Sequence, residues 1–218
     1  QDRPRHFVGA FQRDPREGYA SRFYSFLLTV KDGPDFLDRI RPESEKSGAA
    51  MRAGPIGYLA DIAEVKRLAD IQARVTHDTS DGVASGVASA LMVHYTRHGL
   101  GELAQLGEFL CDEVPARADW NVPWMGQVGS KGWMSVRAAI TALQGTQSLS
   151  EVLLRCVQYG GDVDTVAAIA LGTGACSPEL QNDLPPSLTE RLEDGPFGLQ
   201  FLKDLDARLS AAFPTLVT

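Results

Sequence analysis

Apolar residues recur every three or four positions along most of this chain, which is the spacing of amphipathic helices. Between Tyr19 and Val30, for example, Phe23, Phe26 and Leu27 fall on one face. The same spacing predicts helices over residues 6–13, 19–30, 58–74, 83–97, 103–114, 135–143, 150–159, 187–193 and 197–212, and another from 162–165 to about 174. After the break at residues 31–34, Asp35 can cap a short turn through Phe36 and Leu37. No segment alternates with the period of two typical of a half-buried strand. The sequence therefore predicts an all-α protein with a single domain over residues 1–218.

Small residues indicate how two of these helices pack. The helix over 83–97 carries alanine, glycine and serine along its apolar face, which predicts close contact with other helices. Gly172 and Gly174 lie inside the helix that ends near residue 174. Glycine destabilises a helix interior by about 0.5–1 kcal/mol relative to alanine, so close packing is the expected reason for both glycines.

Composition limits the classes of partner. The chain has 218 residues and a formal net charge of −7, whereas non-specific nucleic-acid binding needs a cationic face. No apolar run reaches the length of a membrane-spanning helix, and the N-terminus does not resemble a signal peptide. The three cysteines, Cys111, Cys156 and Cys176, have no metal-type spacing and are expected to be free buried thiols. We therefore expect a cytoplasmic protein that binds neither nucleic acid nor membrane; its first residue is not Met, which leaves a start further upstream open.

The densest polar cluster is the Gly-Gly-Asp-Val-Asp-Thr sequence over Gly160–Thr165, which precedes an alanine-rich apolar segment. Asp and Thr favour helix starts, which places Asp162 on the entry turn and Asp164 and Thr165 at the cap or first turn. Two carboxylates and a hydroxyl are a hard ligand set for Mg²⁺, Mn²⁺ or Ca²⁺, and a cation would offset the repulsion between the carboxylates. The alternative is an acidic helix cap without an ion, which the helix dipole favours by itself.

Three further polar patches fall at loops or helix starts, over Ser44–Arg52, Thr76–Asp81 and Gly126–Gly132. His77 can hold a substrate or a carboxylate, or it can be a capping or core residue. The glycine spacing at 126, 129 and 132 suggests either a phosphate-binding loop or a mobile surface loop, because the strand of a dinucleotide-binding motif does not precede it. No serine or cysteine has an adjacent base that would make it a nucleophile.

The segment Asp162–Val166 also matches the Asp-x-Asp-x-(Thr/Val) motif of haloacid-dehalogenase-type phosphatases. That chemistry needs the first aspartate at the end of a buried strand. Residues 153–157 have helical spacing instead, and the motif comes late in the chain. A phosphatase is therefore the weaker alternative.

Taken together, four segments resemble the ADP-ribosylglycohydrolase family. Gly160–Thr165 is similar to that family's Gly-Gly-Asp-x-Asp-Thr metal motif, and Ser47–Gly57 is similar to its Asn-Gly-x-x-Met-Arg-x-x-Pro-x-Gly segment. Thr76 and His77 resemble its Thr-His pair, and the Gly126–Gly132 loop resembles its glycine-rich substrate loop. The segments follow one another in the family's order and the resemblance covers essentially the whole chain.

The resemblance implies an orthogonal bundle of α-helices that holds two Mg²⁺ ions, with Mn²⁺ as an alternative, at one end of a cleft. It implies Asp162, Asp164 and Thr165 as metal ligands, and ions that orient ribose hydroxyls and activate or position water. It also implies a set of substrate-binding residues: Ser44, Ser47, Gly48, Met51, His77, Gly126, Gly129 and Gly160.

Two departures from the family pattern concern the site. The family's other metal ligands, a Thr-Asp-Asp-Thr motif, and its acidic catalytic residue would lie before residue 1, so no catalytic residue is identified in this chain. As it stands, the chain is expected to hold half a metal site and to bind Mg²⁺ poorly. In addition, Ser47 replaces the usual Asn, and Glu45 and Lys46 stand where some relatives have an aromatic residue that stacks on adenine. The substrate's identity is therefore open.

The sequence thus predicts a Mg²⁺-dependent hydrolase that cleaves the glycosidic bond of an ADP-ribosylated protein or of a small ADP-ribosyl compound. The alternative is a catalytically incomplete relative that keeps the ADP-ribose cleft without a working metal centre. An upstream Thr-Asp-Asp-Thr motif would distinguish the enzyme from the binding protein.

Overall fold

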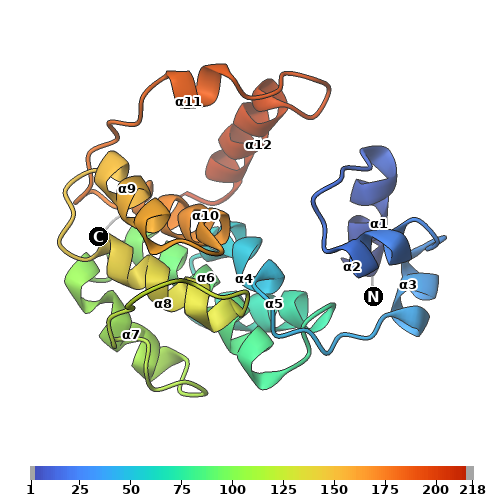
Figure 1. Ribbon diagram of the computed structural model, residues 1–218, viewed down its shortest axis with the longest axis horizontal. Helices are drawn as coiled ribbons and strands as arrows, with labels where there is room; N and C mark the ends of the chain where they lie inside the picture. The colour runs from blue at the N-terminus through green and yellow to red at the C-terminus, as the bar shows by residue number, and fades with distance from the viewer. Residues whose placement is uncertain (1–2, 215–218) are drawn as a thin grey trace. The chain divides into compact units, whose positions relative to one another are not determined.

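The structure is a computed structural model that describes residues 3–214 (Figure 1). Within these residues the chain forms twelve α-helices, two short 3-10 helices and isolated β-bridges, with no strand. The all-α prediction is confirmed. The chain divides into two compact units, one ending at Pro42 and one beginning at Glu43. This division does not decide whether the units fold as one, so a single domain over residues 1–218 stays a prediction.

The first unit contains α1 (Arg3–Arg13), α2 (Ser21–Leu27) and α3 (Gly33–Arg39). Its interior is built largely from aromatic rings in edge-on contacts, which are favourable for ring pairs beyond the area that they bury. The rings belong to Phe11, Tyr19, Phe23, Tyr24, Phe26 and Phe36.

The start of α3 differs from the prediction. The sequence favoured Asp35 as the cap of a short turn, but the N-cap is Asp32, whose carboxylate accepts the Asp35 backbone N–H at 2.9 Å. Pro34 then occupies the first turn, where its missing N–H has no consequence. The helix therefore begins earlier than predicted.

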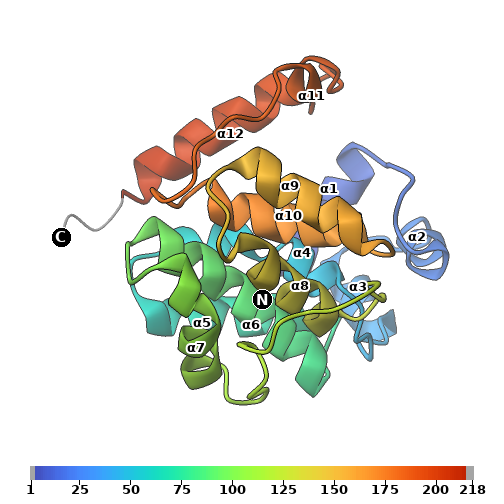
Figure 2. The ribbon, with the colours of Figure 1, turned by 60° about the vertical axis from the view of Figure 1, so that its left-hand side comes forward.

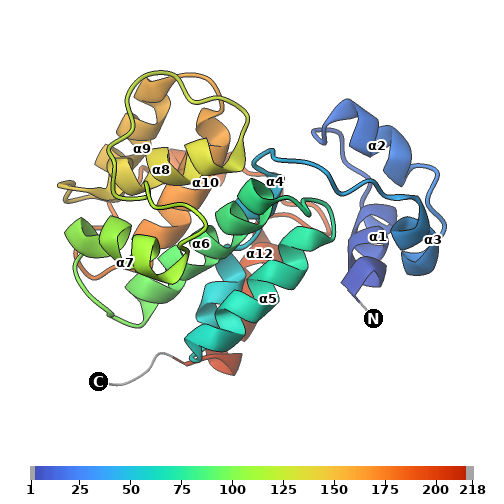
Figure 3. The same cartoon turned by 90° about the horizontal axis from the view of Figure 1, so that it is seen from below.

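The second unit is organised around α6 (Ser80–Arg97), which packs against helices on several sides (Figures 2 and 3). Figure 2 shows α8, α10 and α9 side by side, and Figure 3 shows α5 beside α6. The other helices of this unit are α4 (Gly48–Met51), η1 (Gly54–Tyr58), α5 (Ile62–Arg74), η2 (Leu103–Gln105), α7 (Leu106–Glu113), α8 (Gly132–Leu143), α9 (Leu149–Tyr159), α10 (Val163–Gly174), α11 (Ser187–Glu190) and α12 (Leu199–Ala212).

Small side chains let α6 lie in the interior. It is buried almost throughout, as expected of a helix that is apolar or small on every face. A Cβ at Gly86 would lie 3.1 Å from the Ala73 Cβ of α5, which is tighter than an ordinary contact. The predicted close contact along this helix is confirmed.

The 3-10 helix η1 lies close against α6. A Cβ at Gly57 would lie 2.5 Å from the Ala90 carbonyl oxygen and 2.7 Å from the His94 backbone nitrogen. The Leu59 carbonyl then lies within hydrogen-bond distance of two buried rings, at 2.9 Å from His94 Nδ1 and 3.1 Å from His98 Nε2. Burial lowers the pKa of both imidazoles.

In two places a 3-10 helix takes up the first part of a predicted α-helix. The helix expected over 58–74 begins at Ile62, because residues 54–58 form η1 and Asp61 caps α5 by accepting the N–H groups of Ala63 and Glu64. The helix expected over 103–114 consists of η2 followed by α7. The helix starting at the Gly160–Thr165 segment is present, with Asp162 at its N-cap position.

The two glycines of α10 differ in their surroundings. A Cβ at Gly174 would lie 3.0 Å from side-chain atoms of Leu149 and Leu180, so close packing is confirmed there. Gly172 has no neighbour within 4 Å of that position, and the same expectation was wrong for it. The three cysteines are free, but Cys156 is fully buried and the other two are half-buried. No helix among residues 3–214 is both long and apolar enough to cross a membrane.

Alanine substitutions at Gly57 and Gly172 should have opposite effects on stability. Gly57→Ala should lower the free energy of unfolding by about 1–3 kcal/mol, because its methyl group overlaps the α6 backbone. Gly172→Ala is the matched control and should raise it by about 0.5–1 kcal/mol, since alanine favours the helix and the space is open. Urea denaturation measures both, and a neutral Gly57→Ala would contradict the packing of η1 on α6.

Candidate functional site

The Gly160–Thr165 segment forms the turn into α10. Asp162 occupies the N-cap position, yet its side chain accepts no capping hydrogen bond from the helix backbone. Instead the buried Thr165 hydroxyl donates to Asp162 Oδ1 at 2.9 Å. The carboxylate of Asp162 is therefore engaged with a side chain and not with the helix N-terminus, which argues against a simple capping role.

The same threonine joins this turn to Ser47, the N-cap residue of α4, which lies 118 positions earlier in the chain. Ser47 Oγ lies 3.3 Å from Thr165 Oγ1. Because Thr165 has one hydroxyl proton and donates it to Asp162, it accepts the Ser47 proton. Met51, at the end of α4, is exposed, and its sulfur lies 4.0 Å from the same Thr165 oxygen. Four of the predicted site residues, Ser47, Met51, Asp162 and Thr165, thus form one cluster.

The glycine pair allows a loop to lie against this turn. Gly160 and Gly161 have φ angles of +70° and +78°, which side chains rarely adopt. A Cβ at Gly161 would overlap the carbonyl oxygen of Val128. The backbone bonds confirm the contact, since Val128 N–H donates to the Gly160 carbonyl and Asp162 N–H donates to the Val128 carbonyl, both at 3.1 Å.

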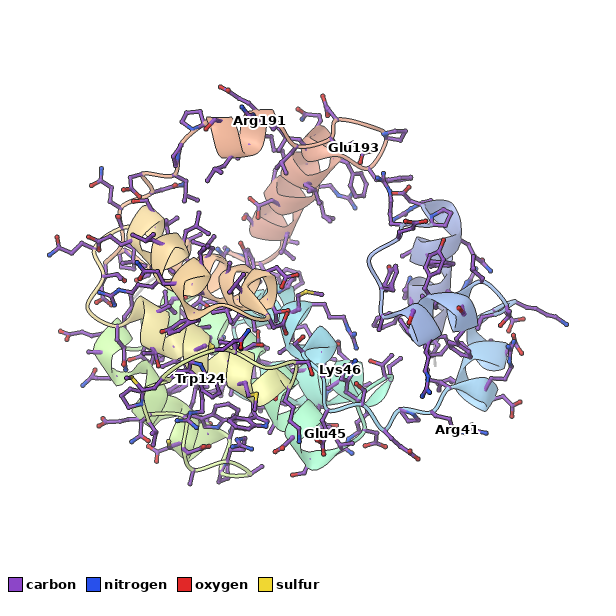
Figure 4. The ribbon with its side chains drawn as sticks, in the orientation of Figure 1. Arg41, Glu45, Lys46, Trp124, Arg191 and Glu193 are labelled. Carbon is purple, nitrogen blue, oxygen red and sulfur yellow. The ribbon has the colours of Figure 1, made fainter. Side chains whose placement is uncertain are left out.

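The Gly126–Gly132 loop is held on its other side by the segment that leads into α4. The Ser47 N–H donates to the Ser130 carbonyl at 3.1 Å, and the Gly132 N–H donates to the Glu45 carbonyl at 3.0 Å. Glu45 also pairs with Lys131 at 2.8 Å; Figure 4 shows Glu45 and Lys46 just before α4. The loop therefore runs between the starts of α4 and α10.

At the other end of α4, Arg52 joins it to α5 and to the Thr76–His77 pair. Its guanidinium donates to the Gly48 carbonyl at 3.1 Å, to Gln72 Oε1 at 2.5 Å and to the Thr76 hydroxyl at 2.7 Å. The Thr76 oxygen in turn lies 2.6 Å from His77 Nδ1. Arg52 is therefore part of the structural frame of the site.

His77 is buried, with 7% of its surface exposed, and its ring faces Gly48. Burial, with a smaller contribution from the positive charge of Arg52, lowers the pKa of His77 from the ordinary 6.5 to about 4. The imidazole is consequently neutral at pH 7. This makes it a hydrogen-bonding group and not a cation.

The remaining predicted residues lie around these contacts. Ser44 accepts the Lys46 N–H through its hydroxyl and the Thr79 hydroxyl through its carbonyl. Gly126 is exposed, and its carbonyl accepts from the Trp124 indole at 2.9 Å; Figure 4 labels Trp124. A Cβ at Gly129 would lie 2.8 Å from Met134 Sδ.

Asp164 is exposed on the first turn of α10, and no hydrogen bond within residues 3–214 links it to the cluster.

Sequence reasoning missed one of the residues that build the site, Gln72. Gln72 lies on the last turn of α5, and Thr76, which the resemblance had named, lies just beyond the end of that helix; both accept hydrogen bonds from Arg52. The signal available was Arg52 itself, a charge among small apolar residues that needs buried partners. The sequence did not reveal which partners these would be.

Comparison with known proteins gives the family. Residues 5–215 match the model of the ADP-ribosylglycohydrolase family. The chain belongs to this family. An uncharacterized protein of Archaeoglobus fulgidus is 28% identical over 185 residues, which covers 76% of this chain and 58% of that protein. The chain thus spans less than two thirds of that relative's length. A solved structure, an ADP-ribosylglycohydrolase-related protein complex, matches with a TM-score of 0.69 at 20% identity, over 98% of this chain and 75% of that one.

The all-α fold is that of the ADP-ribosylglycohydrolases. This overturns the phosphatase alternative, because Asp162 follows the helix α9 and no strand precedes it within the described residues. The matching motif is a coincidence of residue types in a helical setting.

The oxygen atoms at the start of α10 are of the chemical type that a hard metal ion prefers. Asp162, Asp164 and Thr165 offer two carboxylates and a hydroxyl, and Mg²⁺ commonly uses one or two carboxylates while keeping several waters. Over residues 3–214, however, no three His, Cys, Asp or Glu side chains are grouped as a metal site requires. The metal-ligand roles of Asp162, Asp164 and Thr165 therefore stay predictions.

Gly161→Ala should separate the Gly126–Gly132 loop from the α10 turn. The positive φ and the overlap with the Val128 carbonyl should lower the free energy of unfolding by about 1–3 kcal/mol and speed hydrogen exchange at the Val128 amide. Gly145→Ala is the control, since Gly145 also has a positive φ, +67°, but no neighbour within 4 Å. Equal exchange at Val128 in both variants would contradict the proposed contact.

The His77 ring should titrate near pH 4 in the folded protein. Its folded pKa lies below the unfolded value, so neutral His77 contributes stability above about pH 6.5, and that contribution is lost as the pH falls toward 4. NMR of the ring signals against pH measures the titration. Denaturation of the wild type and of His77→Asn over the same range should show a shallower loss of stability in the variant. A ring that titrates at 6.5 would refute the burial argument.

Proposed function

We propose that this protein is a Mg²⁺-dependent hydrolase that cleaves the glycosidic bond of an ADP-ribosylated protein or a small ADP-ribosyl compound. Membership of the ADP-ribosylglycohydrolase family supports a glycohydrolase-type activity. The observation that carries the proposal is the chain of hydrogen bonds from Ser47 through Thr165 to Asp162. It joins two segments that, by resemblance, belong to the substrate site and the metal site.

Asp162, Asp164 and Thr165 are the residues that would hold Mg²⁺. When bound, such an ion acts as a Lewis acid that orients oxygen ligands and lowers the pKa of water. The chain's own residues would prepare the site for it. Thr165 orients the Asp162 carboxylate, and Ser47 directs its proton to Thr165, which leaves a threonine lone pair available to a cation.

The substrate would lie along α4 and the glycine-rich loop. Gly48 has no side chain beside the His77 ring, and Gly126 leaves the loop backbone exposed, so backbone amides and the neutral imidazole can approach a sugar or a phosphate oxygen. Met51, exposed beside Thr165, supplies an apolar edge next to the polar cluster. Discrimination between a protein and a small-molecule substrate would depend on groups beyond these contacts.

The second candidate is an ADP-ribose-binding relative without a working metal centre. One observation favours it: within residues 3–214, the carboxylates of the α10 turn have no further His, Cys, Asp or Glu side chains grouped with them. Such a protein would bind ADP-ribose equally well with and without Mg²⁺.

The test is calorimetric titration of ADP-ribose into the 218-residue chain, with and without Mg²⁺. The hydrolase proposal predicts binding that strengthens with Mg²⁺, at Mg²⁺ concentrations high enough for the partial ligand set, and a loss of that Mg²⁺ effect by at least about tenfold in Asp162→Asn. Asp204→Asn is the matched control, because this exposed carboxylate on α12 contacts Gln200 and should leave binding unchanged.

Each outcome distinguishes the candidates. Binding that ignores Mg²⁺ favours the binding protein over the hydrolase. No binding from a folded chain contradicts both. Where Mg²⁺ strengthens binding, release of ADP-ribose from ADP-ribosylated protein is the direct assay, and its absence in wild type would reject the enzyme.

A further inference from the structure

The hydrogen bonds around Arg52 fix the position of protons further along the network. A guanidinium has donors and no acceptor, and it stays charged in proteins. At 2.7 Å from Arg52 Nη2, the Thr76 oxygen can only accept from it. Thr76 therefore keeps its own hydroxyl proton to donate elsewhere.

The second neighbour of that hydroxyl is His77. The Thr76 oxygen lies 2.6 Å from His77 Nδ1, and Thr76 is buried, with 6% of its surface exposed. A buried hydroxyl proton without an acceptor is unfavourable, so it points at Nδ1. Nδ1 then carries no proton. In a neutral imidazole the proton must consequently lie on Nε2.

The other edge of the ring, which bears Nε2, faces the site. A Cβ at Gly48 would lie 3.3 Å from His77 Cε1 and 3.5 Å from Nε2, so the ring edge lies over the Gly48 backbone. Gly48 follows Ser47, which is bonded to Thr165. No hydrogen bond to Nε2 occurs among those of the described residues, and the N–H is consequently left for a ligand.

We infer that Arg52 and Thr76 are positioning residues that hold His77 as the Nε2–H tautomer, so that the site presents an uncharged donor to an acceptor oxygen. The ligand class is a sugar hydroxyl or a phosphate oxygen, and this last clause rests on the proposed function. The tautomer itself follows from the contacts of the free protein. A neutral donor discriminates by direction and not by charge, which suits a ligand whose oxygens must be placed in one orientation.

The test reads the protons directly, by ¹⁵N NMR of the His77 ring in labelled protein at pH 7. We expect Nε2 to be protonated and Nδ1 bare in the wild type and in Thr76→Ser, which keeps the hydroxyl. Thr76→Val removes it and should raise the fraction of the Nδ1–H form. Thr146→Val deletes another buried hydroxyl, which donates to the Leu143 carbonyl, and should leave the His77 signals unmoved.

A wild-type ring protonated on Nδ1 would overturn the inference, and so would a Thr76→Val ring whose tautomer is unchanged. The Thr76→Ser rescue separates positioning from a general loss of structure, and the wild-type spectrum alone decides the issue if Thr76→Val fails to fold.

Failure of the inference can be told from failure of the proposed function, because the spectrum needs no ligand. If ADP-ribose binds, Thr76→Val should weaken it by about fivefold to tenfold, the effect of one misdirected hydrogen bond, while Thr76→Ser should not. Normal binding in Thr76→Val would remove His77 from the ligand contacts.

Discussion

The contacts of Arg52 are those on which the candidate site most depends. A guanidinium that is partly buried must have its donors satisfied, and here three separate parts of the chain supply the acceptors: the start of α4, the α5 side chain Gln72, and Thr76 beyond the end of α5. Each acceptor is fixed in turn by its own helix or neighbour. Through Thr76, the contacts of this one charge reach the His77 ring.

That arrangement requires helices to approach closely, and glycine and alanine make this possible. Gly86 of α6 faces Ala73 of α5, and Gly161 admits the Val128 carbonyl. Larger side chains at these positions would push apart the segments whose polar groups must meet at hydrogen-bond distance. The packing of small residues and the hydrogen bonding of the site are therefore two aspects of one constraint.

Helical spacing predicted most of the fold, because an apolar face must be buried wherever it recurs every three or four residues. Local hydrogen bonding decided the boundaries, as with Asp32 in place of Asp35 and the turn of η1 before α5. The α10 glycines show the limit of such reasoning, since the helix penalty is the same at Gly172 and Gly174 while the neighbours differ. Neighbours come from tertiary packing, which no local pattern encodes.

The candidate site was predictable in its residue types and not in its connections. The sequence placed Asp162 on the entry turn, and the resemblance named Ser47 and His77. The hydrogen bond from Ser47 to Thr165 spans 118 positions and depends on how α4 and α10 both pack on α6. The role of Asp164 stays a prediction, as does the metal, because this exposed carboxylate makes no hydrogen bond to the cluster within residues 3–214.

The four-residue helix α4 has a consequence of its own. At about 1.5 Å per residue it is a single rigid turn, held at one end through Ser47 and at the other through Arg52. Hydrogen bonds through this one turn therefore connect Asp162 to Thr76. Linkage requires any coupling between two binding sites to be reciprocal. If a ligand at the α10 turn changes the affinity for a ligand beside His77, the ligand beside His77 changes the affinity at the α10 turn by the same factor.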